Sequence, residues 1–251
     1  MLCINLPIYE YIIGIIICIG SIISYIPQYY TLIKTKSSVG LSEFSIILSN
    51  MSFFLLSYDS IISNFYRLQC FKTCHMLFCM GYMMSFIQLL LGWILVSILY
   101  ILYLKYKIRE SRTSTIYNFI YVIIYGICIL IITIISLISL YHMNDYIKMF
   151  NILTKIVGIF AGICTFLLWV PQIYLLIRKR EIGSLNIYMF LIQIPGNIIT
   201  IMFQILYKSN WTIWLSYIIS VIEQFTVVFL IISILKSGKI KPQYILLQEE
   251  M

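Results

Sequence analysis

The sequence predicts an all-α integral membrane protein with seven transmembrane helices, and its composition, apolar runs and charge placement all support this. Of the 251 residues, 62% are hydrophobic and 10% are charged, whereas an average globular chain has about 25% charged residues. The long apolar runs recur along the whole chain, and its few charges lie mainly in the gaps between them. So few charges cannot cover the surface of a soluble domain. The pattern also excludes a disordered chain and a nucleic-acid partner.

Seven apolar runs reach the length of about 20 residues that a helix needs to cross a bilayer. Their lysines and arginines lie only near the ends, as the cost of burying a cation in lipid requires. They do not alternate polar and apolar residues, as the strands of a membrane barrel do. The predicted spans are residues 8–32, 43–63, 76–104, 116–142, 152–177, 185–208 and 211–235.

The gaps between these spans predict the orientation. Twelve lysines and arginines lie in the C-terminal tail and in the loops that follow the first, third and fifth spans, against five on the opposite side. Because positive loops stay in the cytosol, we expect a cytosolic C-terminus and a lumenal or external N-terminus. Trp211 and Trp214, at the predicted lumenal end of the last span, fit an interfacial aromatic belt.

Two segments of the chain repeat each other. Residues 24–42 read SYIPQYYTLIKTKSSVGLS, and residues 167–186 read LLWVPQIYLLIRKREIGSLN. Both place Pro-Gln late in a span, then basic residues, a glycine and the start of the next helix. Aligning Gly40 with Gly183 gives a repeat of 143 residues, whereas the two prolines are 144 apart. Four crossings separate the copies, so the halves point the same way, as in transporters with parallel repeats.

The repeat divides the chain into two three-helix bundles joined by an inverting linker helix. The first bundle takes residues 1–105 and the linker helix lies within 106–150. The second bundle takes residues 151–235, and residues 236–251 form a cytosolic tail.

The repeated Pro-Gln pairs predict hinges. A proline inside a helix removes one backbone hydrogen bond and bends the helix, so Pro27 and Pro171 are the expected hinge residues. The neighbouring Gln28 and Gln172 would either bond the freed carbonyl group or face a cavity and contact solute. A single pair could be a harmless kink, but two pairs at matching positions favour a shared role.

The doubled Pro-Gln motif, the basic turns and the seven spans resemble the PQ-loop repeat family. The segment KSSVGLS at 36–42 is similar to cystinosin-type proteins, whereas GSLNIYMFLIQIPGN at 183–197 is similar to a little-studied subgroup of fungi and protists. The resemblance implies a proton-coupled exporter of a small polar solute, most plausibly an amino acid, in a lysosome, vacuole or other endomembrane. Two alternatives stay open: a SWEET-like sugar uniporter, and a non-transporting receptor or sorting protein like the KDEL receptor.

Polar and small residues on one face of the sixth predicted span are the main candidates for solute contact. Such residues also hold membrane helices together, so both roles stay open; the sixth span contributes to the central cavity in the family, which favours lining. Aligning the repeats by their glycines pairs Asn50 with Gln193. The candidate lining residues are Asn50, Gln193, Pro195, Gly196, Asn197 and Thr200.

Two acidic residues inside predicted spans are candidates for proton coupling. Glu223 lies 12 residues into the seventh span, near the membrane midplane. Asp59 lies towards the lumenal end of the second span, where it could instead reach water. Burial of a carboxyl group favours its protonated form, and acids inside membranes are often proton relays. A neutral, hydrogen-bonded structural acid is the alternative for Glu223.

The remaining motifs suggest processing and sorting rather than chemistry. Tyr244, followed three residues later by Leu247, resembles a tyrosine-based sorting signal for cytosolic adaptors. Cys70 and Cys74 share a predicted lumenal loop, where a disulfide could form. We expect no catalytic residues, no metal and no cofactor. The expected partners are membrane lipid, a small solute, protons and sorting adaptors.

Overall fold

The structure is a computed structural model, which describes residues 8–63, 76–110, 126–127, 147–179, 182, 184–206 and 209–236. All of the regular structure in these ranges is α-helical. The helices are α1 (Ile8–Thr35), α2 (Glu43–Ser63), α5 (Met76–Glu110), α7 (Ile147–Leu168), α8 (Val170–Lys179), α9 (Ile187–Leu206) and α10 (Trp211–Lys236).

Six of the seven predicted spans are present as helical segments long and apolar enough to cross a membrane. The second matches its prediction of 43–63 at both ends, whereas α5 extends past residue 104 to Glu110. The fifth span is interrupted at Trp169, which separates α7 from α8. The predicted fourth span, 116–142, lies outside the described residues except for Gly126 and Ile127, so it stays a prediction.

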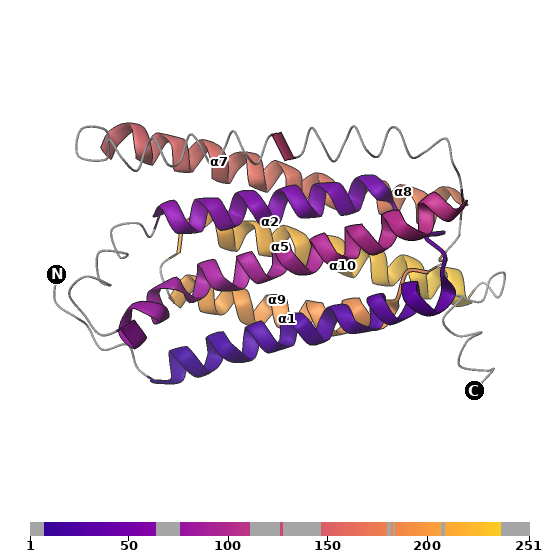
Figure 1. The fold of residues 1–251 in the computed structure, drawn as a ribbon, viewed down its shortest axis with the longest axis horizontal. Coiled ribbons are helices and arrows are strands. Elements are labelled where there is room, and N and C mark those ends of the chain that lie inside the picture. Colours follow the sequence, from indigo (N-terminus) through magenta and orange to yellow (C-terminus); the bar gives the residue numbers. More distant parts are fainter. Residues whose placement is uncertain are drawn as a thin grey trace.

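The contacts between the six spans close into a ring. In the first half α5 lies between α1 and α2, and in the second half α10 lies between α9 and the α7–α8 span (Figure 1). The halves meet along two seams, α2 against α7 and α1 against α9. Because α2 corresponds to α9 and α1 to α7–α8 in the repeat, exchanging the halves converts one seam into the other. This is the symmetry expected of two parallel bundles.

The two halves also point in the same direction. The loops after α1 and α8 bond to each other, since Ser184 N donates to Val39 O at 2.8 Å. We call this side, formed by residues 36–42 and 184–186, the loop end. At the opposite side, the far end, α2 finishes beside the start of α10, where Thr212 Oγ1 donates to Asp59 Oδ2. The chain leaves α5 at the loop end and enters α7 at the far end, so residues 111–146 connect opposite ends of the bundle.

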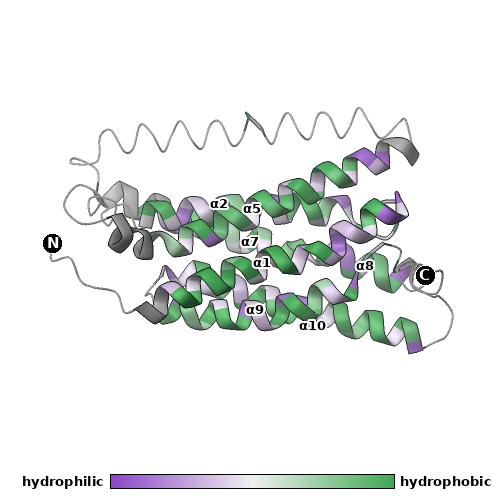
Figure 2. Cartoon of the chain, turned by 60° about the horizontal axis from the view of Figure 1, so that its bottom comes forward, coloured by the Kyte–Doolittle hydropathy of each residue, from purple (hydrophilic) through white to green (hydrophobic). Residues whose placement is uncertain are grey.

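The ring buries many polar side chains among its apolar core residues and exposes apolar side chains on its outside, unlike a soluble domain. Buried polar side chains include Gln28, Gln88, Gln172 and Gln204, whereas isoleucines such as Ile16 are exposed. Figure 2 shows apolar residues along the helices and hydrophilic residues concentrated at the loop end of α5 and α10. This distribution fits helices whose outer faces contact lipid.

Candidate functional site

The site begins at the loop end, where Gln28 of α1 binds the loop of the second half. Its Nε2 donates to Ser184 O at 3.0 Å, and its Oε1 accepts from Asn186 N at 3.0 Å. Asn186 is the N-cap of α9, because its Oδ1 accepts from Tyr188 N at 2.9 Å. Gln28 is fully buried. The first half therefore holds the start of α9 in place.

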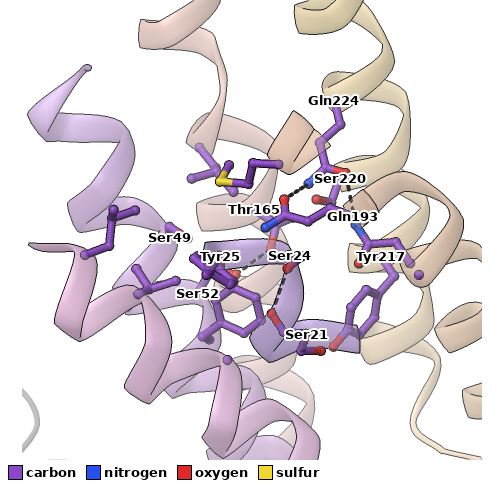
Figure 3. Close-up of a pocket in the computed structure, with 18 of the residues that line it drawn as sticks. Ser21, Ser24, Tyr25, Ser49, Ser52, Thr165, Gln193, Tyr217, Ser220 and Gln224 are labelled. Atoms are coloured by element: carbon purple, nitrogen blue, oxygen red, sulfur yellow. Dashed lines mark hydrogen bonds between the residues drawn. The ribbon is translucent and has the colours of Figure 1, made fainter. Parts of the chain in front are cut away.

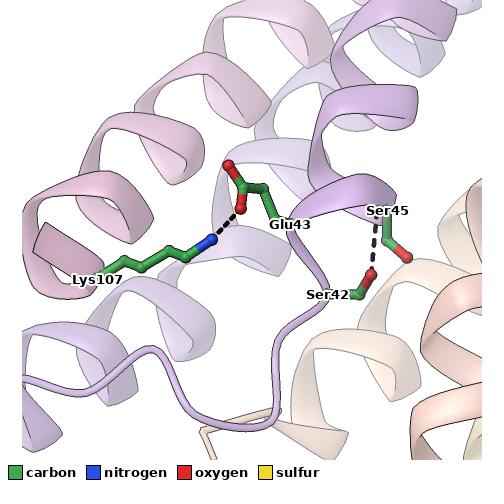
Figure 4. A network of polar contacts seen from close by, with 4 residues as sticks. All are labelled: Ser42, Glu43, Ser45 and Lys107. Carbon is green, nitrogen blue, oxygen red and sulfur yellow. Dashed lines mark hydrogen bonds and ion pairs between the residues drawn. The ribbon is translucent and has the colours of Figure 1, made fainter. Parts of the chain in front are cut away.

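Gln172 makes the same pair of bonds in the opposite sense. Its Nε2 donates to Gly40 O at 2.8 Å, and its Oε1 accepts from Ser42 N at 2.9 Å. Ser42 is the N-cap of α2, since Ser45 N donates to its Oγ at 3.3 Å (Figure 4). We call the four bonds made by Gln28 and Gln172 the crossed clasp. The glutamines therefore do not satisfy their own helices, as one prediction had it; each binds the backbone of the other half.

The crossed clasp fixes the repeat at 144 residues, since Gly40 takes the place of Ser184 and Ser42 that of Asn186. The glycine alignment, at 143, was wrong by one residue because the second loop has one residue fewer between its proline and its glycine. In the corrected register, Ser49 rather than Asn50 corresponds to Gln193.

A cavity of about 230 Å³ lies between the two halves, next to the crossed clasp. Side chains from all six spans line it. At roughly 30 Å³ per water molecule, it has room for seven or eight waters, so it suits a small solute. Apolar side chains make up most of the lining; among the polar groups, the first half contributes mainly serine hydroxyls and the second half adds amides. The residues labelled in Figure 3 are Ser21, Ser24, Tyr25, Ser49, Ser52, Thr165, Gln193, Tyr217, Ser220 and Gln224.

An amide network crosses the cavity wall. Asn197 Nδ2 donates to Gln224 Oε1 at 3.0 Å, and Gln224 Nε2 donates to Gln193 Oε1 at 3.0 Å. The network therefore connects α9 to α10 within the second half. No residue that lines the cavity in the described part of the chain carries a charge.

Two more hydrogen bonds join the two halves beside the cavity. Ser52 Oγ and Thr165 Oγ1 are 2.6 Å apart between α2 and α7, and Gln88 Nε2 donates to Thr200 Oγ1 at 3.0 Å between α5 and α9. All four residues line the cavity. A solute bound there can thus exchange hydrogen bonds with both halves at once.

Four of the six predicted lining residues face this cavity: Gln193, Gly196, Asn197 and Thr200. The other two, Asn50 and Pro195, lie outside its lining. Asn50 binds α2 to α5 within the first half, because its Nδ2 donates to Ser97 Oγ and its Oδ1 accepts from Trp93 Nε1, both at 2.9 Å. Ser49 lines the cavity instead. Counting the repeat from the prolines would have identified Ser49 from the sequence.

The predicted hinges differ in their surroundings. Pro27 lies within α1, which is one continuous helix of 28 residues. Pro171 lies two residues beyond Trp169, where the α7–α8 span is interrupted. Pro195 lies within α9, which is continuous through it.

Glu223 is buried in α10, but it is not part of the cavity lining; the next residue, Gln224, is. Within the described part of the chain, Glu223 Oε2 has no hydrogen-bond partner. Thr226, which the helix register placed near this carboxyl group, donates to Ile222 O at 3.0 Å. A buried carboxyl oxygen without a hydrogen-bond partner costs free energy. Within the described part of the chain, no hydrogen bond to Glu223 Oε2 offsets this cost.

Asp59 is fully buried at the far end. Its carboxylate accepts from Ser63 Oγ and Asn210 Nδ2, both at 3.1 Å, and from Thr212 Oγ1 at 2.6 Å. A Cβ atom on Gly158 of α7 would lie 2.8 Å from Asp59 Oδ2. Asp59 therefore does not reach lumenal water, as one alternative expected, but joins α2 to α10 close to α7.

The sorting motif of Tyr244 and Leu247 and the cysteine pair Cys70 and Cys74 lie outside the described residues. Among the residues that the structure does describe, no three histidine, cysteine or acidic side chains gather as a metal site would require.

The sequence comparisons agree with the repeat found in the geometry. The family model for the PQ loop repeat matches the chain twice, at residues 9–69 and 153–213. The two matches are 144 residues apart, the same spacing as the crossed clasp. A comparison with curated proteins finds no match. The chain is therefore a membrane protein that belongs to the PQ-loop repeat family.

Proposed function

We propose that the protein is a carrier that moves a small polar solute across the membrane by opening its central cavity to each side in turn. The observation that carries this proposal is the cavity itself, which both halves line and which the crossed clasp adjoins at the loop end. Rocking of the halves about the cavity, with Pro27 and Pro171 as hinges, would break the clasp and open the loop end.

The neutral lining favours an uncharged solute with several hydroxyl or amide groups, such as a sugar or polyol. Serine hydroxyls and glutamine amides can each donate and accept hydrogen bonds to such a solute. A carboxylate or ammonium group taken from water into the same cavity would meet no opposite charge among the described lining residues, at a cost of several kcal/mol. This supports the sugar uniporter among the family alternatives.

A proton-coupled amino-acid exporter is the second candidate, and Glu223 is the observation that favours it. Its unpartnered carboxyl oxygen lies in the residue next to Gln224, a member of the amide network. Rocking would change the hydration of this carboxyl group, and with it the affinity for a proton. Asp59, whose carboxyl group accepts three hydrogen bonds, is the next candidate.

Flux in proteoliposomes tests the carrier proposal. The panel comprises neutral hexoses, polyols and neutral amino acids, each measured with and without a pH gradient. Gly196 lines the cavity, and a Cβ placed on it meets nothing within 4 Å, so Gly196→Leu should fill the cavity and abolish flux, whereas Gly196→Ala should retain it. Solute binding without flux would instead indicate a receptor. Equal flux in the Leu variant would contradict the role given to this cavity.

Glu223→Gln separates the two solute candidates. The amide keeps the shape of the side chain and mimics the protonated acid. In a coupled carrier it should abolish pH-driven accumulation while exchange down the solute gradient continues. If the protein is a uniporter, the pH gradient should not change solute transport by the wild type or by the variant. Thr226→Ser, an exposed change three residues away, is the matched control. If Glu223→Gln accumulates solute with unchanged pH dependence, the coupling site lies elsewhere, and Asp59 is tested next.

The hinges can be tested by the rate of exchange. Pro171→Ala should let α7 and α8 form one continuous helix and slow the exchange between open states. Pro27→Ala should have a smaller effect, because α1 is continuous already. Equal rates for the wild type and the Pro27→Ala, Pro171→Ala double variant would show that the prolines are only structural.

For the location we propose an acidic organelle of the lysosomal or vacuolar type, with the C-terminus cytosolic. Support comes from the family resemblance, the bias of positive charge and the Tyr244–Leu247 motif. Fluorescence microscopy of a protein tagged at its N-terminus tests the motif, since Tyr244→Ala should move the protein to the cell surface. A distribution identical to that of the wild type would remove the motif from the argument.

A further inference from the structure

Four basic side chains near the loop end lie over tyrosine rings, between 5.4 and 5.9 Å from the ring centroids. The pairs are Lys34–Tyr30, Arg178–Tyr174, Lys105–Tyr106 and Lys107–Tyr103. In the last two pairs the rings are buried, and Lys107 is ion-paired with Glu43. In the first two, the rings are 54% and 53% exposed. Neither Lys34 nor Arg178 has an acidic partner within the described part of the chain.

These two exposed pairs occupy equivalent positions in the two halves. Tyr30 and Tyr174 are 144 residues apart, as are Lys34 and Arg178, and each tyrosine follows its hinge proline by three residues. The ring and the cation are four residues apart on one helix, so they lie on the same face.

The same face carries exposed aliphatic side chains, again in both halves. Ile26 and Ile33 accompany the pair on α1, at 53% and 51% exposure, and Val170 and Ile177 take the same places on α8, at 45% and 59%. On each face, therefore, an apolar stripe that faces lipid ends in an exposed aromatic ring and a cation with no acidic partner among the described residues.

We propose that each pair, Tyr30–Lys34 and Tyr174–Arg178, binds the phosphate group of an anionic phospholipid. Arg178 Nη1 donates to the Tyr174 hydroxyl oxygen, which leaves the hydroxyl proton and the other guanidinium N–H groups free to donate to phosphate. Lys34 offers the three donors of an ammonium group. The aliphatic stripe next to each pair can contact the acyl chains of a lipid. A soluble phosphate ion has no such chains.

Such a lipid would hold the segment that follows each hinge at the membrane surface. The two segments carry Gln28 and Gln172, so the bound lipids would flank the crossed clasp from outside. Basic residues at a membrane surface attract anionic lipid by about 1 kcal/mol each. Removing one should therefore weaken lipid binding about fivefold.

Native mass spectrometry of the full chain, purified in detergent and titrated with phosphatidylserine or phosphatidylcholine, tests the proposal. We expect two phosphatidylserine molecules to bind more tightly than phosphatidylcholine. Lys34→Gln and Arg178→Gln should each weaken one binding event about fivefold, the double variant should weaken both, and Arg178→Lys should retain binding. Lys236→Gln is the matched control, because Lys236 is exposed at the end of α10 and has no tyrosine one turn before it.

Three outcomes would overturn the inference. An equal loss in Lys236→Gln would show a general effect of surface charge. Equal binding of the two lipids would show that the phosphatidylserine charge is not recognised. Displacement of the lipid by millimolar inorganic phosphate would show a free-anion site rather than a lipid site. Thermal unfolding of each variant in lipid-free detergent, expected to match the wild type, separates lost binding from lost folding.

Discussion

The two halves of the ring carry the same crossed clasp on helices of different continuity. In the first half, Thr31 Oγ1 and Asn186 Nδ2 both donate to Pro27 O, at 2.9 and 3.2 Å, and α1 is continuous. In the second half, the corresponding positions hold Leu175, which has no donor, and Ser42, whose side chain is shorter. There the span is interrupted at Trp169. The same Pro-Gln motif therefore lies in a continuous helix in the first half and next to a helix break in the second.

The comparison extends to the ends of the neighbouring helices. Glu43, at the start of α2, is ion-paired with Lys107 of α5 (Figure 4), whereas the matching position at the start of α9 is Ile187. At the far end, the position of Asp59 on α2 is taken by Phe203 on α9. Polar contacts therefore hold α2 at two positions where α9 has none, and we expect α9 to yield first when the halves rock.

The largest effect is expected at Asp59. Asp59→Ala leaves the buried Thr212 hydroxyl and the half-buried Asn210 amide without an acceptor, and hydrogen bonds to a charged group contribute about 1.5–3 kcal/mol each. The free energy of unfolding should fall by about 3–5 kcal/mol, measured by denaturant titration in mixed micelles. Phe203→Leu, at the corresponding position, should cost less than about 1.5 kcal/mol. A loss below about 1 kcal/mol for Asp59→Ala would contradict this role of Asp59.

Breaking the crossed clasp should have the next largest effect on stability, and the effect should differ between Gln28 and Gln172. Gln172→Leu leaves the Gly40 carbonyl and the Ser42 N–H without their hydrogen-bond partner, and each unsatisfied group costs about 1–3 kcal/mol. The free energy of unfolding should therefore fall by about 2–4 kcal/mol. Gln28→Leu should cost less, because Asn186 remains bonded to Thr31 and Pro27 O. Ile173→Leu is the control. Equal losses for the two glutamine variants would remove the asymmetry between the halves.

A pair of glycines compares the halves at the far end. Gly14 and Gly158 are equivalent in the repeat, but a Cβ on Gly158 would lie 2.7 Å from Thr212 Oγ1, whereas one on Gly14 would lie 3.2 Å from the flexible Met84 side chain. Gly158→Ala should therefore destabilise by about 1–3 kcal/mol through overpacking. Gly14→Ala should be neutral or stabilising, since alanine favours a helix by about 1 kcal/mol. Thermal unfolding of both variants measures the difference, and the reverse order would contradict it.

The spans and the repeat could be predicted from the sequence because both depend on local pattern. Hydropathy placed α2 at its observed bounds, and Pro-Gln marked the two halves. Apart from Ser63, the partners of Gln28 and Asp59 could not be predicted, because they lie 151 to 158 residues away and belong to the other half. The sequence predicted hinges at Pro27 and Pro171 alike; it did not predict that only the second span is interrupted, at Trp169.

The smallest effect, and the finest test of the asymmetry, is expected at the ion pair of Glu43 and Lys107. The two side chains are 19% and 23% exposed, so water and salt screen their attraction, and such pairs contribute about 0.2–1 kcal/mol. A double-mutant cycle with Glu43→Gln and Lys107→Gln should give a coupling in this range that shrinks as salt is raised. If the pair braces the first half, Glu43→Gln should also increase the solute exchange rate, whereas Ile187→Leu should leave it unchanged. A zero coupling at low salt would mean that this ion pair does not contribute to the rigidity of the first half.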